Sequence, residues 1–330
     1  MYGVEGRASF WIWPDGGIEL VHNCRMIDFL KTMRDPQVRD LIWVMAAPGL
    51  MRESCALNFA VPDTFGQAAV QHSMPVLQAL DRDPSPLHEW IAVRKSQRLG
   101  RYFESLLEYW ITHLLGGEII AANLAVKLGD IVTGEYDFLW RDATGVLNHW
   151  EASVKLYLQV DAAAGLAGYI GTLTRDRLDL KFAHLRDKQL KLSGTVAGQA
   201  ALPRAGEIVH ARALLKGWLF YPYGQVAIAP AEVSPQHLSG WWMRWGTSGF
   251  NPQPGLFWKI LPRLEWFTPA MRPNTEGLQA EADFRDALEV HFATDGAPLL
   301  VAGLLATGND WQEVTRGFMV PAYWNLRNPE

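Results

Sequence analysis

The chain of 330 residues has little cysteine, no long apolar run and no excess of positive charge. Its two cysteines, Cys24 and Cys55, stand in unlike contexts, which excludes a disulfide framework and favours a reducing compartment. The longest apolar runs, around 41–51 and 298–306, are too short to span a bilayer. The segment 1–17 lacks the continuous apolar core of a signal peptide. We therefore expect a soluble, cytoplasmic protein with no membrane partner.

The charge balance argues against a protein with a global basic field. Lys and Arg number 30 against 35 Asp and Glu, a net charge of −5, so any contact with nucleic acid has to come from local patches. The nine histidines show no paired spacing with other His or Cys, which argues against a zinc site. A Walker-type nucleotide loop and a Gly-x-Ser-x-Gly elbow are both missing from the sequence.

The most informative pattern that is present lies in the segment TGEYDFLWRDATGVLNHWEASVKLYL, residues 133–158. In its first arm Glu135 and Asp137 alternate with aromatic residues. In its second arm Glu151 and Lys155 share one face, and bulky apolar residues share the other. A period of two residues is typical of half-buried strands. The segment therefore predicts a β-hairpin.

The turn of this hairpin predicts its register. A three-residue loop with Gly145 in the left-handed conformation pairs Asp142 with Val146, which places Asp137 directly opposite Glu151. Their β-carbons are then roughly 4.5 to 5.5 Å apart. Carboxylates so close need either full solvation or a cation such as Mg²⁺, which takes oxygen ligands of this kind. The alternative is a solvent-exposed polar face of a two-layer sheet.

A helix bearing acids precedes the hairpin. Apolar residues in 87–115 recur at spacings of three and four, which predicts an amphipathic helix, and a strand over 117–127 follows. Glu104 and Glu108 flank the apolar stripe, and Arg101 can pair with Glu104. In a compact helix–strand–hairpin unit a helical acid can reach the sheet face. The alternative is an ordinary solvated helix face.

Further elements are predicted on both sides of this unit. Asp35-Pro36 is expected to begin a helix over 37–47, a short helix is expected within 65–80, and a strand is expected over 212–221. The turn at 294–298 predicts a hairpin of 288–293 against 299–305. The tryptophans of 240–245 are interpreted either as a platform for bases or sugars or as the filling of a small core.

A basic helix is predicted from Arg175 onward. It carries Lys181, ends near Gln189 and contains six positive charges diluted by three aspartates. Such a helix can contact a phosphate backbone, or it can be a solvated helix with internal ion pairs. A second possible footprint comprises Arg94, Lys95, Arg98 and Arg101.

Several blocks together resemble a known family. They are RLGRYFESLLEYW, TGEYDFLWRD, HWEASVKLYL, Asp179-Leu180-Lys181, Gln189-Leu190, LLKGWLFYP and HLSGWW. The chain is similar from about residue 25 onward to the bacterial family known as domain of unknown function 1853, which is grouped with the PD-(D/E)XK nuclease superfamily. The resemblance implies a restriction-endonuclease-like mixed sheet flanked by helices, and one or two Mg²⁺ or Mn²⁺ ions.

In that superfamily a helical Glu, an Asp on the second strand and an acid on the third strand bind the metal. The matching residues here are Glu104, Asp137 and Glu151. The superfamily lysine is expected two residues after the third acid, but Ser153 stands there and the lysine comes at Lys155, about 13 Å along the strand from Glu151. A bulge would be needed to bring Lys155 back, or Lys127 or Lys181 would replace it.

The resemblance and the residues lead to one set of expectations. The parts are an N-terminal extension and helical part over 1–86, a nuclease-like core over 87–225 and a Trp-rich α+β part over 226–330. The expected function is Mg²⁺-dependent phosphodiester hydrolysis in DNA by Asp137, Glu151, Glu104 and Lys155. Glu135, Lys181, Gln189 and Arg101 are expected to give nucleic-acid or supporting contacts. The alternatives are a non-catalytic nucleic-acid-binding or scaffold protein and, from the tryptophans, carbohydrate binding.

Overall fold

The structure is a computed structural model that describes residues 26–52, 60–94, 97–204, 206–247, 249–294 and 296–325. Expectations for the opening segment, and for Lys95, lie outside these residues. The α-helices are α1 (Met26–Lys31), α2 (Pro36–Ala46), α4 (Asp63–His72), α5 (Met74–Arg82), α6 (Ser85–Arg94), α7 (Leu99–Tyr109), α8 (Leu178–Asp187), α9 (Val196–Ala200) and α10 (Glu281–Ala293). A π-helical turn, η1 (Trp110–Leu114), continues α7, and short 3-10 helices are η2 (Gly165–Gly168), η3 (Gln189–Gly194) and η4 (Arg263–Glu265).

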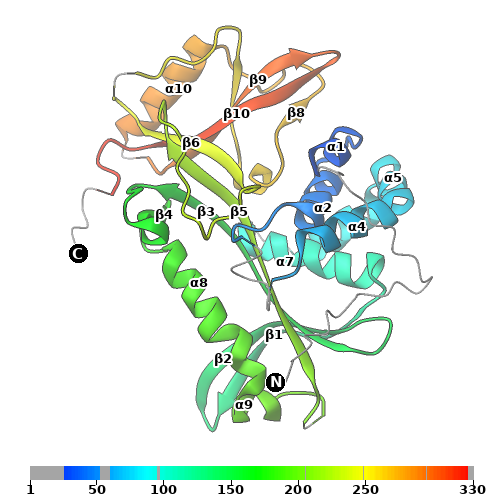
Figure 1. Cartoon of the computed structure of the whole chain (residues 1–330). Coiled ribbons are helices and arrows are strands. Elements are labelled where there is room, and N and C mark those ends of the chain that lie inside the picture. Colours follow the sequence, from blue (N-terminus) through cyan, green and yellow to red (C-terminus); the bar gives the residue numbers. More distant parts are fainter. Residues whose placement is uncertain are drawn as a thin grey trace, which may run out of the picture.

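A mixed sheet runs through the molecule in the order β1-β2-β3-β5-β6-β10-β9-β7 (Figure 1). Its strands are β1 (Glu118–Leu128), β2 (Ile131–Arg141), β3 (Leu147–Gln159), β5 (Val209–Pro222), β6 (Leu238–Arg244), β7 (Phe257–Ile260), β9 (Leu299–Thr307) and β10 (Asp310–Val320), with β4 (Tyr169–Gly171) beside β3 and β8 (Met271–Arg272) beside β10. β1, β2 and β3 are antiparallel neighbours, whereas β3–β5, β5–β6 and β6–β10 are parallel pairs. The protein is therefore a mixed α/β protein, as expected.

The predicted hairpin register is confirmed. β2 pairs with β3 from Arg141↔Leu147 to Phe138↔Trp150, and Gly145 in the turn has a φ of 85°. The turn is stabilised by the Asp142 side chain, which accepts hydrogen bonds from the backbone N–H groups of Thr144 and Val146 at 2.9 and 3.0 Å. A left-handed residue at this point suits glycine because glycine has no Cβ to clash.

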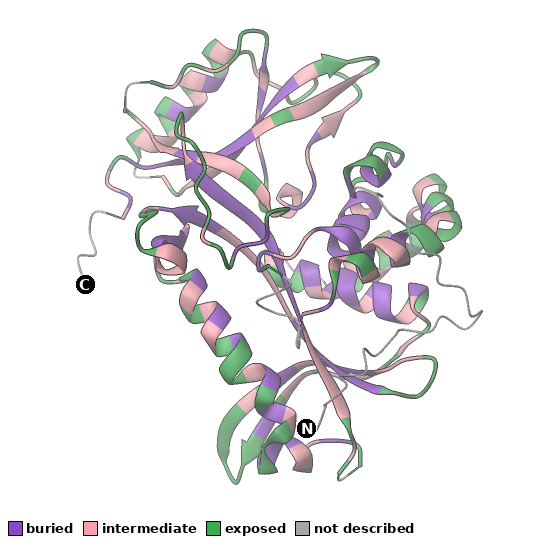
Figure 2. Cartoon of the chain, in the orientation of Figure 1, coloured by how far each residue is buried: buried purple, intermediate pink, exposed green. Residues whose placement is uncertain are grey.

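The two faces of the β1–β2–β3–β5 region are covered by different helices. α7 and α2 pack on one face, where their apolar side chains meet Phe138, Trp140 and Trp150. α8 packs on the other face near the far end of β3, and η3 and α9 cover the β1–β2 hairpin. Figure 2 shows the buried residues concentrated in the central strands and in the helices that face them. The sheet thus has a helical layer on each side at the level of the predicted acids.

The C-terminal strands carry their own core. α10 packs over β7, β9 and β10 through Phe284 and Leu288, which are fully buried with Trp258. Trp242 is 7% exposed and Trp258 1% exposed, while Trp241 and Trp266 are half-buried. Of the tryptophans of 240–245, Trp242 is a core residue, and Trp241 and Trp245 pack against the core while half-buried.

One prediction about secondary structure was wrong, and one was incomplete. The expected strand 288–293 is the end of α10, because Phe284 and Leu288 are buried one helical turn apart while Val290 is 72% exposed. β9 instead pairs with β10. Where one short helix was expected within 65–80 there are two, α4 and α5, and Pro75 lies in the first turn of α5, where proline is tolerated.

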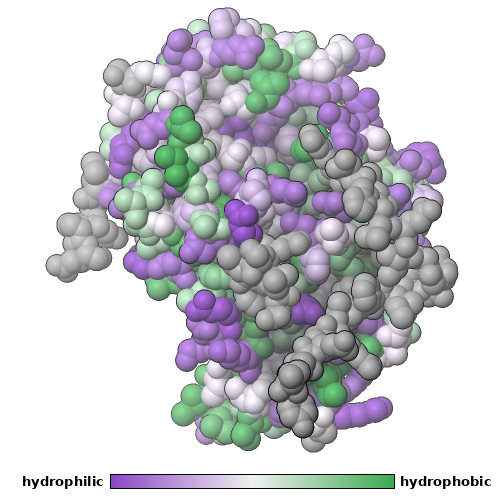
Figure 3. Space-filling view, viewed as in Figure 1, coloured by the Kyte–Doolittle hydropathy of each residue, from purple (hydrophilic) through white to green (hydrophobic). Residues whose placement is uncertain are grey.

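The β1–β2 hairpin reaches the end of the molecule with an apolar tip. Leu128, Ile131 and Val132 are 61%, 71% and 58% exposed. Figure 3 shows a hydrophobic patch at the lower end of this view, where the hairpin and α9 lie in Figure 1. Among the described residues, no helix is both long and apolar enough to cross a membrane.

Candidate functional site

Strands β2 and β3 separate at the predicted acids. Their ladder ends at Phe138↔Trp150, and beyond this pair β2 continues with β1 while β3 continues with β5. Asp137 lies at the fork, where its Oδ2 accepts a hydrogen bond from the backbone N–H of Ala152 at 2.9 Å. The Asp137 carboxylate thus accepts from a β3 backbone N–H that has no backbone acceptor on β2 at this point. Asp137 and Glu151 therefore lie where the two strands part.

Three polar residues lie in one row across the strands. The flanking pairs Ala122↔Phe138 and Leu124↔Tyr136 set Asn123 opposite Asp137. One step beyond Phe138↔Trp150, the same register sets Asp137 opposite Glu151. The two carboxyl groups lie close enough for each to shift the pKa of the other. We call Asp137 and Glu151 the acid pair.

Glu151 is 1% exposed and each of its oxygens has a donor. His149 Nε2 lies 2.6 Å from Oε1, and the Gln189 side-chain amide donates to Oε2. Burial lowers the pKa of His149 to about 4, so the imidazole is neutral at pH 7 and this contact is a hydrogen bond, not an ion pair. These donors fix the plane of the carboxylate and leave lone pairs on both oxygens for another ligand.

Gln189 links Glu151 to a lysine. Lys181 Nζ donates to Gln189 Oε1 at 3.0 Å. Because an ammonium group only donates and a carboxylate only accepts, the amide oxygen has to face Lys181 and the amide nitrogen has to face Glu151. Residues from α8 and η3 thereby hold a positive charge near the acid pair. Burial lowers the pKa of Lys181, and the positive charge of Lys155 lowers it further.

The electrostatics of the acid pair are unfavourable in the absence of a cation. Burial raises the pKa of Asp137 to about 7, and the charge of Glu151 adds to this effect. Burial also raises the pKa of Glu151 to about 7, although Lys181 opposes the rise. Two adjacent carboxyl groups titrate as a pair and share one proton until a positive charge stabilises both anions. The oxygen donors therefore fit a hard divalent cation.

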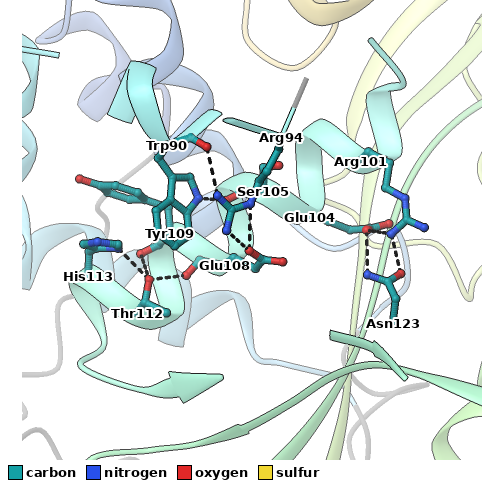
Figure 4. A network of polar contacts seen from close by, with 10 residues as sticks. All are labelled: Trp90, Arg94, Arg101, Glu104, Ser105, Glu108, Tyr109, Thr112, His113 and Asn123. Atoms are coloured by element: carbon teal, nitrogen blue, oxygen red, sulfur yellow. Dashed lines mark hydrogen bonds and ion pairs between the residues drawn. The ribbon is translucent and has the colours of Figure 1, made fainter. Parts of the chain in front are cut away.

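Glu104 lies beside this row but is held by other partners. Its carboxylate pairs with Arg101 Nη1 at 2.6 Å, and the same guanidinium nitrogen donates to Asn123 Oδ1 at 2.6 Å (Figure 4). Burial raises the pKa of Glu104, Arg101 lowers it, and the negative charge of Asp137 raises it. The charge of the acid pair therefore affects the pKa of Glu104, but the hydrogen-bond partners of Glu104 are Arg101 and Asn123. Within the described ranges, no three His, Cys, Asp or Glu side chains converge as a metal-binding group.

Lys155 points to a different partner. Its Nζ lies 2.5 Å from Asp176 Oδ2, and the same carboxylate accepts from the Tyr157 hydroxyl. β3 pairs with β5 without a register shift from Leu147↔Val209 to Leu158↔Phe220, so the bulge that would bring Lys155 back toward Glu151 is not present in this ladder. Opposite Lys155, Gly217 has a φ of 148°, and a Cβ there would clash with the Lys155 carbonyl oxygen. The lysine linked to Glu151 is Lys181.

The remaining predicted contacts lie at the edge of the site or away from it. Glu135 is exposed on β2, and its charge contributes to the raised pKa of Glu151. On α8 and the segment that follows, Arg177 pairs with Asp179, and Arg186 and Lys191 both pair with Asp187. These contacts agree with the interpretation of a solvated helix that contains ion pairs. The Arg94 side chain pairs with Glu108 and packs over Trp90.

Two residues of the site were missed by sequence reasoning. His149 stands two positions before Glu151 and so had to lie on the same strand face, which was a usable signal. Asn123 has a φ of 52° in the interior of β1, a strained conformation that sequence alone does not reveal.

No curated protein and no solved structure matches the chain. A family model described as Domain of unknown function (DUF1853) matches residues 39–320, which is more than half of the chain. This range contains the acid pair and the elements that hold it. The chain belongs to the DUF1853 family.

Proposed function

We propose that the protein is a Mg²⁺-dependent nuclease that hydrolyses phosphodiester bonds in DNA at the β2–β3 fork. The observation that carries the proposal is the acid pair, in which Glu151 is buried and Asp137 is half-buried, and both carboxyl groups have raised pKa values that a cation would counter by stabilising the anions. The element order α7–β1–β2–β3 supports it, because it supplies a helical Glu, a second-strand Asp and a third-strand Glu as the superfamily resemblance implies. The restriction-endonuclease-like arrangement is part of this proposal.

Each residue has a role that its contacts support. Asp137 and Glu151 hold the cation, and Glu104 adds a direct or water-bridged ligand. A bound Mg²⁺ lowers the pKa of a water ligand and neutralises charge that develops on the phosphate oxygens. Lys181 orients the attacking water or stabilises the leaving oxygen, and Gln189 fixes its position relative to Glu151. His149 orients the Glu151 carboxylate.

Cleavage assays test this proposal. Purified protein is incubated with linear, circular, single-stranded and branched DNA in Mg²⁺ or Mn²⁺, beside Asp137→Ala prepared in the same way. We expect cleavage by the wild type and none by the variant. Lys181→Ala should lower the rate about 100-fold, the scale of a lost proton-transfer or charge-stabilising group, whereas Lys155→Ala should retain most of it. Equal cleavage by wild type and Asp137→Ala would refute the assignment.

A second candidate function is a non-catalytic nucleic-acid-binding or scaffold role on the same fold. The contact of Lys155 with Asp176 favours it, because the lysine nearest in sequence to Glu151 does not reach the acid pair. This candidate predicts DNA binding without cleavage of any substrate in the panel. Cation-dependent cleavage that Asp137→Ala abolishes would exclude it.

A further inference from the structure

Glu104 and Arg101 form an ion pair where a metal ligand and a phosphate ligand would each be needed. Glu104 is the third metal ligand of the proposed function, and its carboxylate contacts Arg101 and Asn123. Arg101 extends from the same turn of α7, and half of its side chain (51%) is exposed. A guanidinium group binds phosphate oxygens well once it is free of a carboxylate.

Asn123 holds both partners from the strand below. Its Oδ1 accepts from Arg101 at 2.6 Å, and its Nδ2 lies 3.5 Å from Glu104 Oε2. Its position opposite Asp137 puts this contact next to the acid pair in the cross-strand row. Figure 4 shows Arg101, Glu104 and Asn123 as one group, separate from the Arg94–Glu108 pair one helical turn away.

Resting on the nuclease proposal, we propose that Arg101, Glu104 and Asn123 form a latch that couples cation binding to DNA binding. In the closed state, described here, Arg101 neutralises Glu104 and is not available to substrate. A divalent cation on the acid pair competes with Arg101 for the Glu104 carboxylate. When Glu104 binds the cation instead of Arg101, Arg101 is released and can bind a DNA phosphate. Asn123 is the positioning residue that keeps Arg101 at the site after the exchange.

The latch makes a specific prediction about DNA binding without a cation. Glu104→Gln weakens the hold on Arg101 and should raise cation-free affinity for DNA about tenfold, which is within the range of ordinary allosteric couplings. Glu108→Gln is the matched control, because it removes the same charge from the same helix and releases Arg94. The control should change affinity by about twofold or less, because the Arg94–Glu108 pair is separate from the Arg101–Glu104–Asn123 group.

Two more variants test the other half of the exchange. Arg101→Gln should bind Ca²⁺ more tightly than the wild type, since Glu104 loses its ion pair, and yet gain less DNA affinity when Ca²⁺ is added. Asn123→Gly keeps the left-handed backbone that glycine adopts easily but removes the amide. It should weaken DNA binding in Ca²⁺ and leave the acid pair able to bind the cation.

Fluorescence anisotropy with labelled DNA that has a duplex and a single-stranded arm gives these affinities at one fixed salt concentration. Calorimetry with Ca²⁺ gives the affinity for the cation. Because the two binding events are thermodynamically linked, DNA has to raise the Ca²⁺ affinity by the same factor by which Ca²⁺ raises the DNA affinity. Suppose that the wild type binds both Ca²⁺ and DNA. If Glu104→Gln and Glu108→Gln then bind DNA with equal affinity in the absence of a cation, the latch alone is overturned. A wild type that binds neither ligand would overturn the proposed function and the latch together.

Discussion

Buried charges are treated in opposite ways in two regions of the molecule. In the C-terminal half, Arg316 on β10 forms a two-point ion pair with Glu313 at 2.6 and 2.9 Å and also donates to the carbonyl oxygens of Trp266 and Thr268. At the β2–β3 fork, Asp137 and Glu151 bring two acids together. The charges of Arg316 and Glu313 neutralise each other within the chain. The charges of Asp137 and Glu151 repel each other, so a bound positive charge would stabilise them. The first arrangement serves stability, and the proposed function assigns the second to cation binding.

The largest expected effect comes from breaking the satisfied pair. Arg316→Met leaves Glu313 buried without its partner, and both side chains are at most 5% exposed. The free energy of unfolding should fall by about 3 to 5 kcal/mol, as for other buried pairs that lose one member. Urea unfolding of the wild type and the variant measures this. A loss below about 1 kcal/mol would show that the pair is less important than its geometry indicates.

The next effect is a pH dependence caused by the acid pair. A carboxyl group whose pKa is raised by folding stabilises the protein at low pH, and this contribution is lost as the pH rises through the folded pKa. Asp137 and Glu151, with pKa values raised to about 7, should therefore destabilise the cation-free protein as the pH rises from about 4 to about 7. His149, with its pKa lowered to about 4, acts in the opposite direction between about 4 and 6.5.

The double variant Asp137→Asn/Glu151→Gln isolates this contribution. Relative to the wild type, it should gain about 2 to 3 kcal/mol in unfolding free energy between pH 5 and pH 8, since the one proton that the pair shares is lost about two pH units above pH 5 and one pKa unit corresponds to about 1.4 kcal/mol. Asp40, whose pKa is also raised to about 7 by burial, is present in both proteins and cancels in the comparison. Parallel pH profiles of wild type and variant would show that the pair is not under electrostatic strain.

Asp137→Asn alone should raise the free energy of unfolding, whereas Arg316→Met lowers it, and the change should be smaller. The amide keeps an oxygen for the Ala152 N–H and removes the charge next to Glu151. At pH 8 without cations, the unfolding free energy should rise by about 1 to 2 kcal/mol. Asp137→Ala, which also removes the acceptor, should gain less. If Asp137→Asn were destabilised as strongly as Arg316→Met, the two regions would not differ as described.

The smallest effect is expected on the surface of α8. Arg177 pairs with Asp179 at 2.7 Å, but its side chain is 44% exposed. Arg177→Ala should change the free energy of unfolding by less than about 0.5 kcal/mol, because solvent screens exposed pairs. Thermal unfolding measures the change. A loss of more than about 1 kcal/mol would show that this pair supports the packing of α8.

Much of the site followed from local sequence rules. The alternation of acids with aromatic residues, and the glycine of the turn, predicted the register that sets Asp137 opposite Glu151. The link from Lys181 through Gln189 to Glu151 could not be predicted with its geometry, because it depends on how α8 and η3 pack against β3. The α10 error has a local cause. Leu288, Val290 and Phe292 alternate like a strand, whereas Phe284 and Leu288 are buried with helical spacing.

Calorimetric titration of Mn²⁺ at pH 7.5 tests the central claim most directly. The wild type and Glu108→Gln should bind Mn²⁺ alike, because Glu108 pairs with Arg94 away from the fork. Asp137→Asn and Glu151→Gln should each bind at least about tenfold more weakly, because each removes one charged ligand. If both variants bind Mn²⁺ as tightly as the wild type, the acid pair is not the cation site.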